Sequence, residues 1–344
     1  FKTAAYTSGL AVAQVSFGAG GGWAALTGAV TSVGGRTGVA RITAVTNSTT
    51  ATIDILSHFS STNTSLDWYE GEWSDYRGFP SAVSFHEGRL WHAGRDKIWG
   101  SISDSYTSFD PGVDGDSGPI QRSVGYGPVQ VFNGLMSLNR LVGFTQGSEV
   151  QVKSSSFDEP LTPTNFSIKD VSTYGSGSVG QVKVDTRAFY VNRPGHRLME
   201  ISYSVEQQDY RSRDLGLIHP DLNLDNEIVR LAVQRLPDTR IHCVRTDGTV
   251  AILIYEPESE VMAWVRYETD GVVEDVYVLP GDDEDDVYYV VKRTINGATK
   301  RFHEKWAYED ECQGETISKN ADCFYEYSGA STATITGLDH LEGE

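Results

Sequence analysis

Residues 80–306 repeat one pattern about every fifty residues. Five segments each hold three apolar runs separated by short turns. The middle runs are residues 88–93, 139–144, 186–191, 239–244 and 286–291. Four of them carry an arginine just before their apolar stretch, at positions 89, 140, 187 and 240, so the spacings are 51, 47 and 53 residues. Consecutive hairpins at this period are typical of β-propeller blades, which bury their faces against one another.

Glycines occupy the turns between the second and third runs. We expect them to supply the positive φ that tight hairpins require. They are Gly94, Gly147, Gly195, Gly248 and Gly297. The 17 Tyr, 13 Phe, 7 Trp and 35 Gly residues also favour an all-β chain. We therefore predict a β-propeller of five or six blades with a small N-terminal β domain; the alternative is a β-sandwich whose repeat spacing is accidental.

The chain divides into three parts. Residues 1–70 are expected to form a small β domain or part of one, because residues 39–45 and 51–56 alternate like strands around a polar turn. Residues 71–306 are expected to form the propeller. Residues 307–344 break the pattern and are interpreted as a closing strand or linker into a further β domain missing from this chain.

The charge excludes some functions. The chain has 28 Lys and Arg against 47 Asp and Glu, a formal net charge of −19. Gripping a phosphate backbone requires clustered basic residues, so sequence-specific nucleic-acid binding is not expected. No apolar run approaches the ~18–20 residues of a membrane helix, so no membrane insertion is predicted. The first residues do not read as a signal peptide.

Two Asp-rich runs are weak candidates for a cation site. The run 110–116 contains Asp114 and Asp116, and the run 281–286 contains Asp282, Asp283 and Asp285. Carboxylates are the ligands that Ca²⁺ prefers, but neither run has the spacing of the twelve-residue calcium loop. The simpler interpretations are a Gly/Asp turn for the first run and a solvated blade-connecting loop for the second.

No motif predicts catalysis or a cofactor. Residues 175–180 spell GxGxxG, but a strand-like stretch follows where a dinucleotide site needs a helix, so we interpret them as a loop. The histidines have no metal-ligand spacing, and no nucleophile elbow is present. The aromatic residues Trp68, Tyr69, Trp91 and Trp99 fit sugar stacking, although core positions are the simpler interpretation. Cys312 and Cys323 either pair or remain free thiols.

The stretch WYEGEWSDYRGFPSAVSFHEGRLW at residues 68–91 carries a resemblance. Together with residues 98–101 and 106–109, it resembles phage and prophage tail proteins related to the tail tubular protein B, the nozzle of short-tailed phages. Further matching runs are residues 161–163, 247–248, 261–264 and 337–343. The resemblance implies a virion tail protein, assembled in the host cytoplasm, that has no enzymatic activity. It also implies a homo-oligomer, commonly a hexameric ring, which contacts adaptor and fibre proteins and lets DNA pass.

An acidic conduit suits this role, because it repels phosphates. Residues 268–344 contain 19 Asp and Glu against 6 Lys and Arg, so −13 of the −19 lies there. We predict that Asp282, Asp283, Glu284, Asp285 and Asp286 face the channel or its mouth; the alternative is an ordinary solvated surface. The second functional hypothesis is a tail-associated propeller that binds receptors or processes glycans, with a concave site of aromatic residues and carboxylates.

Overall fold

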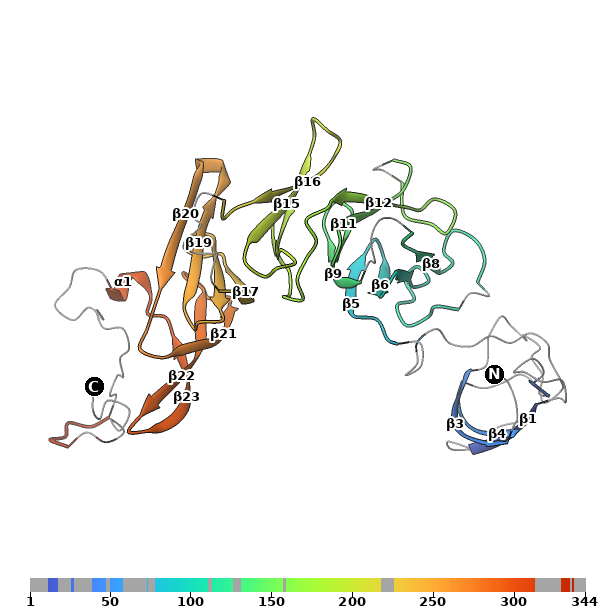
Figure 1. The fold of residues 1–344 in the computed structure, drawn as a ribbon, viewed down its shortest axis with the longest axis horizontal. Coiled ribbons are helices and arrows are strands. Elements are labelled where there is room, and N and C mark those ends of the chain that lie inside the picture. Colours follow the sequence, from blue (N-terminus) through green and yellow to red (C-terminus); the bar gives the residue numbers. More distant parts are fainter. Residues whose placement is uncertain are drawn as a thin grey trace.

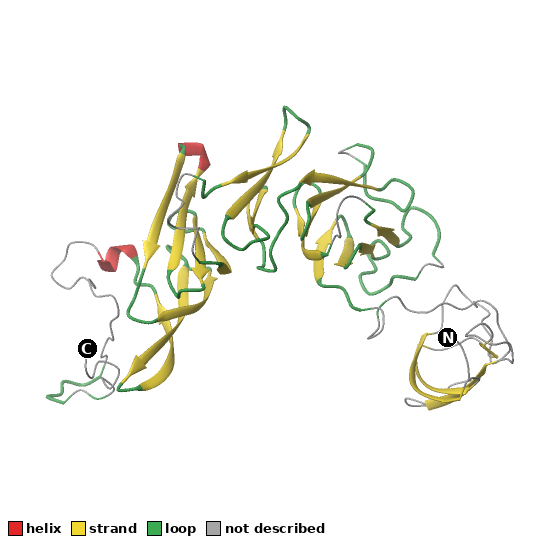
Figure 2. Cartoon of the chain, in the orientation of Figure 1, coloured by secondary structure: helices red, strands yellow, loops and turns green. Residues whose placement is uncertain are grey.

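The chain is described by a computed structural model in which the described strands form antiparallel sheets. The described residues are 12–17, 26–27, 39–47, 50–57, 73, 78–110, 113–125, 131–156, 159–217, 226–312, 329–334 and 336. Figure 2 shows that strands and loops dominate these regions. Among the helices described, none is long and apolar enough to cross a membrane.

The N-terminal sheet has the strand order β2-β1-β4-β3. Its strands are β1 (Val12–Phe17), β2 (Leu26–Thr27), β3 (Val39–Asn47) and β4 (Thr50–Ser57). The hairpin predicted in this region is therefore confirmed as β3 and β4, with strands slightly longer than expected.

Five further sheets follow along the chain, and we number them blades 1 to 5. Blade 1 contains β5 (Ala82–His86), β6 (Arg89–Gly94), β7 (Lys97–Gly100) and β8 (Ile120–Ser123). Blade 2 contains β9 (Phe132–Ser137), β10 (Leu141–Thr145), β11 (Glu149–Lys153) and β12 (Ser167–Ser172). Blade 3 contains β13 (Val182–Val184), β14 (Arg187–Val191), β15 (Leu198–Ser204) and β16 (Asp209–Asp214). Blade 4 contains β17 (Ile228–Gln234), β18 (Arg240–Arg245), β19 (Val250–Glu256) and β20 (Val261–Tyr267). Blade 5 contains β21 (Val272–Leu279), β22 (Asp286–Ile295) and β23 (Ala298–Lys305).

The blades stack face to face along an arc, as in a β-propeller, which confirms the predicted fold class (Figure 1). The first strands of neighbouring blades contact one another, for example β5 with β9 and β17 with β21. In Figure 1 these strands lie on the inner side of the arc, while β12, β16 and β20 lie toward its outer side. The arc stays open between blades 1 and 5, so the described strands do not close a ring.

Successive side chains of a middle strand pack in opposite directions. In β14, Ala188 and Tyr190 belong to the core shared with blade 2, while Phe189 and Val191 belong to the core shared with blade 4. The ring of Tyr190 lies 5.1 Å from that of Phe144 in blade 2. Both faces of the strand are therefore buried, which explains why the middle runs are continuously apolar rather than alternating.

Each interface between blades also contains a hydrogen bond. His86 Nδ1 lies 2.8 Å from Ser137 Oγ between blades 1 and 2, and the backbone N–H of Arg140 donates to Tyr210 Oη over 3.1 Å between blades 2 and 3. Between blades 3 and 4 the Tyr255 hydroxyl donates to Glu200 (2.9 Å), and between blades 4 and 5 His242 Nδ1 lies 2.7 Å from the Tyr289 hydroxyl. Because such directional contacts satisfy buried polar groups, they favour one register of the stacked sheets.

The repeated arginines hold strands together within blades. Arg140 donates to Gln151 Oε1 over 2.6 Å, and Arg187 donates to Glu200 Oε1 over 2.5 Å. In both cases the partner lies on the following strand. Arg240 instead forms an ion pair of 2.6 Å with Asp238, just before β18. The period noticed in the sequence therefore reflects a recurrent polar anchor at the start of the second strand in blades 1 to 4.

The turn glycines differ in what they supply. Positive φ is confirmed at Gly195, Gly248 and Gly297. The prediction of positive φ is wrong for Gly94, the last residue of β6. In that turn the next residue, Arg95, takes the left-handed conformation instead. A Cβ on Gly94 would lie 2.8 Å from the Cα of Pro80, so this glycine is required by a close backbone approach. The expectation of positive φ is also wrong for Gly147. The GxGxxG segment is a loop before β13, as expected.

Residues after blade 5 include a short helix, α1 (Glu309–Cys312), within the region predicted to be a closing strand or linker. Its first residue, Glu309, is linked back to the propeller by a hydrogen-bonded ion pair with Arg240. This contact connects the segment that follows blade 5 to blade 4.

A carboxyl group is buried between blades 2 and 3. Glu149 is fully buried in β11, and its Oε2 accepts a hydrogen bond from the Ser172 hydroxyl. Its Oε1 has no hydrogen-bond partner among the described residues. Burial therefore raises the pKa of Glu149 to about 7, because the low-dielectric interior disfavours the carboxylate.

We predict that Glu149 makes the protein less stable as the pH rises. Its folded pKa of about 7 exceeds the usual 4.5, so the folded state binds more protons than the unfolded state between these values. The free energy of unfolding should therefore fall by ~3 kcal/mol across this window. In the Glu149→Gln variant this loss should disappear.

Urea denaturation of both proteins from pH 4.5 to 8 measures the effect. The comparison with Glu149→Gln matters because burial lowers the pKa of His242 to about 3, which works in the opposite direction as the pH falls below 6.5. The difference in unfolding free energy between wild type and Glu149→Gln, followed over pH, gives the contribution of the Glu149 carboxyl group alone. A difference that stays constant with pH would contradict the prediction.

Candidate functional site

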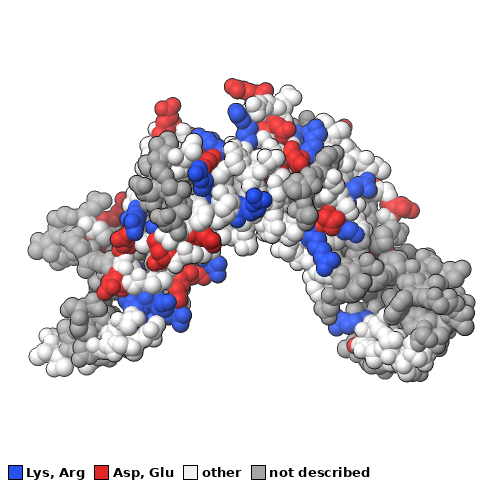
Figure 3. Space-filling view, viewed as in Figure 1, with Lys and Arg blue, Asp and Glu red and all other residues white. Residues whose placement is uncertain are grey.

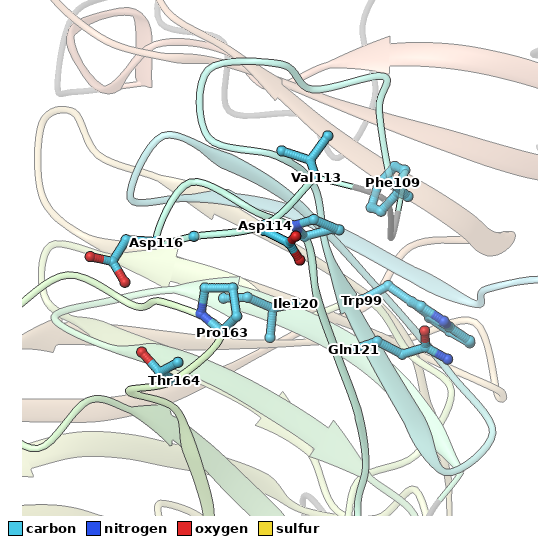
Figure 4. Close-up of a pocket in the computed structure, with 11 residues that line it drawn as sticks. Trp99, Phe109, Val113, Asp114, Asp116, Ile120, Gln121, Pro163 and Thr164 are labelled. Atoms are coloured by element: carbon cyan, nitrogen blue, oxygen red, sulfur yellow. The ribbon is translucent and has the colours of Figure 1, made fainter. Parts of the chain in front are cut away.

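A pocket of about 370 Å³ lies at the outer part of blade 1. One wall is the segment that joins β7 to β8, and the opposite side is the segment between β11 and β12 (Figure 4). Figure 4 shows Trp99 and Phe109 on one side, Asp116, Pro163 and Thr164 on the other, and Asp114 between them. The pocket combines aromatic rings with carboxylate, amide and hydroxyl groups.

Arg89 fixes the shape of the long β7–β8 segment. Its side chain is buried, and Nη1 donates to the carbonyl oxygens of Ser101 and Gly118, each over 2.6 Å. Nη2 donates to the carbonyl of Asp116, also over 2.6 Å. Nη1 also makes a longer contact of 3.4 Å to the carbonyl of Ser117, so four backbone carbonyls converge on one planar guanidinium, which holds the pocket wall against the sheet.

Glycine makes the same wall compact. A Cβ on Gly118 would lie 2.5 Å from the carbonyl oxygen of Val113, so no larger residue fits there without moving the backbone. Gly115 takes a φ of +91°, which L-residues rarely adopt. The wall is therefore built by its backbone and leaves the carboxylates of Asp114 and Asp116 exposed.

The aromatic side of the pocket is supported from behind. Trp73 packs edge-on against Trp99 with ring centroids 5.5 Å apart and against Phe109 at 5.2 Å. His92 lies 4.9 Å from the same Trp73 ring, and burial lowers its pKa. This cluster holds Trp99 at the pocket, whereas Trp91 is fully buried and stacks on Phe166, as the core interpretation predicted. Trp68 and Tyr69 lie outside the described residues.

The first cation candidate, Asp114 with Asp116, is thus found in the wall of this pocket. In the part of the chain that the structure describes, no group of three or more His, Cys, Asp or Glu side chains is placed to hold a metal ion. Two carboxylates alone fall short of the six to eight oxygens that Ca²⁺ takes.

The acidic run 281–286 forms the β21–β22 turn inside blade 5, so the interpretation as a blade-connecting loop is wrong. Asp285 is only 8% exposed and accepts hydrogen bonds from the backbone N–H groups of Arg235 (2.6 Å) and Leu236 (3.1 Å) in blade 4. It therefore does not fit the predicted channel-facing role, because its carboxylate is engaged between blades.

The other acidic residues of the run divide into two groups. Asp286 forms a 2.6 Å ion pair with Lys305, whose hydrogen bond lowers the pKa of the Asp286 carboxyl. Glu284 accepts a hydrogen bond from the Glu309 N–H over 3.0 Å. Asp282 and Asp283 are exposed. Figure 3 shows that acidic and basic side chains alternate over the visible face of the last blades, where no uniformly acidic wall appears.

The end blades each have a face that no other described blade covers. On blade 1, Val83 and Phe85 of β5 are 57% and 62% exposed, and Tyr106 packs edge-on against the Phe85 ring at 5.2 Å. On blade 5, Leu279 is 50% exposed, and Tyr277 stacks on Tyr288 of the adjacent strand at 5.0 Å. The two ends of the arc therefore present partly apolar sheet faces to solvent.

Among the cysteines, Cys243 is buried between blades, and burial raises the pKa of its thiol well above its usual range. Cys312 is a free, exposed thiol, and Cys323 lies outside the described residues.

Comparison with known proteins gives only weak similarities. No known family profile matches the sequence, and no curated protein matches it. Among solved structures, Chaetomium thermophilum Raptor matches with a TM-score of 0.36 and 13% identity, over 66% of this chain and 21% of that one. The Neurospora crassa Pan2 WD40 domain matches with a TM-score of 0.34 and 12% identity, over 67% of this chain and 64% of that one. An exported protein of Bacteroides fragilis matches with a TM-score of 0.31 and 11% identity, over 86% of this chain and 88% of that one. The chain thus spans only about a fifth of Raptor, and similarities at this level carry no inference about function.

We predict that Arg89→Met loosens the β7–β8 segment and lowers stability. Methionine fills the volume of the stem but leaves the carbonyls of Ser101, Asp116 and Gly118 without their donor. An unsatisfied buried carbonyl costs ~1–3 kcal/mol, so the free energy of unfolding should fall by about 3 kcal/mol or more. Hydrogen exchange should become faster across residues 102–119.

The matched comparison is Arg211→Met, at an exposed arginine of β16. Loss of the same positive charge there should leave stability within about 0.5 kcal/mol of wild type. Equal effects of the two substitutions would show that Arg89 has no special role in the wall.

Proposed function

We propose that this chain is a structural subunit of a phage tail, which assembles with copies of itself into the ring through which DNA leaves the virion. The resemblance of residues 68–91, 98–101 and 106–109 to tail nozzle proteins suggests the class. The observation that carries the proposal is the pair of uncovered apolar faces at the two ends of the arc. A role in assembly accounts for them, because large exposed apolar patches on sheets mark interaction sites.

The blade stacking itself supports a second copy as the occupant of these faces. Within the chain, each internal interface joins one face of a blade to the opposite face of the next blade. The free face of blade 5 and the free face of blade 1 are the two unused halves of the same kind of contact. Pairing them between copies gives a head-to-tail interface, which closes into a ring if the rotation per copy allows it.

The N-terminal sheet leaves the blade 1 face open. In Figure 1 it lies beyond blade 1 at the far end of the molecule. The exposures of Val83 and Phe85 therefore remain high in the presence of β1 to β4. An interface that uses these residues needs about 1,000 Å² or more of buried surface to be stable.

We predict that charges on either face disrupt assembly. Phe85→Glu and Leu279→Glu should each reduce oligomers of the wild-type chain to monomers, because a buried unpaired carboxylate is costly. Val205→Glu is the matched control, since Val205 is 81% exposed at the turn between β15 and β16. Analytical ultracentrifugation gives the masses.

Mixing the two face variants tests the head-to-tail arrangement. Each variant keeps one intact face, so an equimolar mixture should form dimers that do not grow further. Monomeric wild type at all concentrations, or unchanged assembly of both variants, would sink the proposal.

We also predict that Asp282 and Asp283 keep DNA from binding the channel. Both are exposed, so replacing them with Asn should leave the fold intact. In phage carrying the double variant, DNA ejection should become slower at low salt, because two repulsive charges are lost. Ejection kinetics identical to wild type at every salt concentration would remove these residues from the channel.

A further inference from the structure

We propose that the pocket of blade 1 binds a neutral saccharide. Its lining places flat aromatic rings opposite oxygen-bearing side chains, and this pairing matches the two surfaces of a pyranose, an apolar C–H face and a rim of hydroxyl groups. The inference goes beyond the structural role proposed above and does not depend on it.

The polar groups of the pocket are available to a ligand. Among the described residues, none donates a hydrogen bond to the carboxylate of Asp114 or Asp116, and the Gln121 amide likewise has no described partner. Carboxylates accept hydrogen bonds from sugar hydroxyls, and an amide both donates and accepts. These three side chains therefore supply complementary partners for a ring of hydroxyl groups.

The pocket is also preformed. Arg89 holds the backbone carbonyls of Asp116 and Gly118 in the wall. The close backbone contact at Gly118 further restricts the conformation of this segment. Trp73 supports the Trp99 ring. A rigid site loses less entropy on binding, which matters for a ligand that offers few apolar atoms.

The charge of the lining selects the class of saccharide. Among the described residues that line the pocket, two carry carboxylates and none is Lys or Arg, so phosphorylated or carboxylated sugars are repelled. Its volume of about 370 Å³ lies at the lower end of the range for small-molecule sites. A neutral mono- or disaccharide unit within a longer glycan fits these limits.

A panel of immobilised neutral oligosaccharides of glucose, galactose and N-acetylglucosamine, with sialylated and phosphorylated counterparts, tests the proposal. We expect the full chain to bind at least one neutral member and none of the acidic ones. Asp116→Asn and Trp99→Ala should each weaken that binding by about tenfold or more, through a lost charge-assisted hydrogen bond and a lost stacking surface.

Asp96→Asn is the matched control, because Asp96 is exposed in the β6–β7 turn and does not line the pocket. It should bind like wild type. Circular dichroism separates lost binding from lost folding, and Asp116→Asn keeps the result interpretable if Trp99→Ala disturbs the aromatic cluster. No binding to any neutral member overturns the proposal, as does preference for acidic sugars. Binding of CaCl₂ alone, without any saccharide, would assign the carboxylates to a cation instead.

Discussion

Every internal blade of this protein has to bury two faces, and the rest of the architecture follows from that constraint. A middle strand such as β14 sends Tyr190 toward one neighbour and Phe189 toward the other. No single blade is stable on this basis, because each contributes only half of every core it shares. Cross-blade contacts such as that of His242 with Tyr289 then add directional bonds to an interface held mainly by apolar burial.

The same constraint makes the ends of the arc informative. Blades 1 and 5 each have one face without a described blade against it, and Phe85 and Leu279 are exposed there. Under the proposed assembly these faces are buried between copies, whereas on an isolated monomer they would favour aggregation. The proposed ring uses the interaction that already joins the blades, repeated between copies instead of within one chain.

The repeated arginine position stabilises the sheet in some blades, and in blade 1 it also fixes the wall of the pocket. Arg140 and Arg187 bind polar side chains on the next strand of their own blades. Arg89 occupies the equivalent position in blade 1 but binds backbone carbonyls of the inserted β7–β8 segment. That insertion replaces a short turn with a pocket wall, so a framework position has become the anchor of a concave site.

The repeat, the all-β class and the burial of Trp91 were readable from the sequence, because local hairpin chemistry and apolar runs recur at a fixed period. The sequence also drew attention to Asp114, Asp116 and Trp99, but for separate reasons. Only the tertiary structure brought them into one pocket, since residues of two blades and two long connections meet there. It likewise placed Asp285 between blades. Neighbours along the chain determine turns and strands, whereas the burial of a particular side chain depends on which distant sheet packs against it.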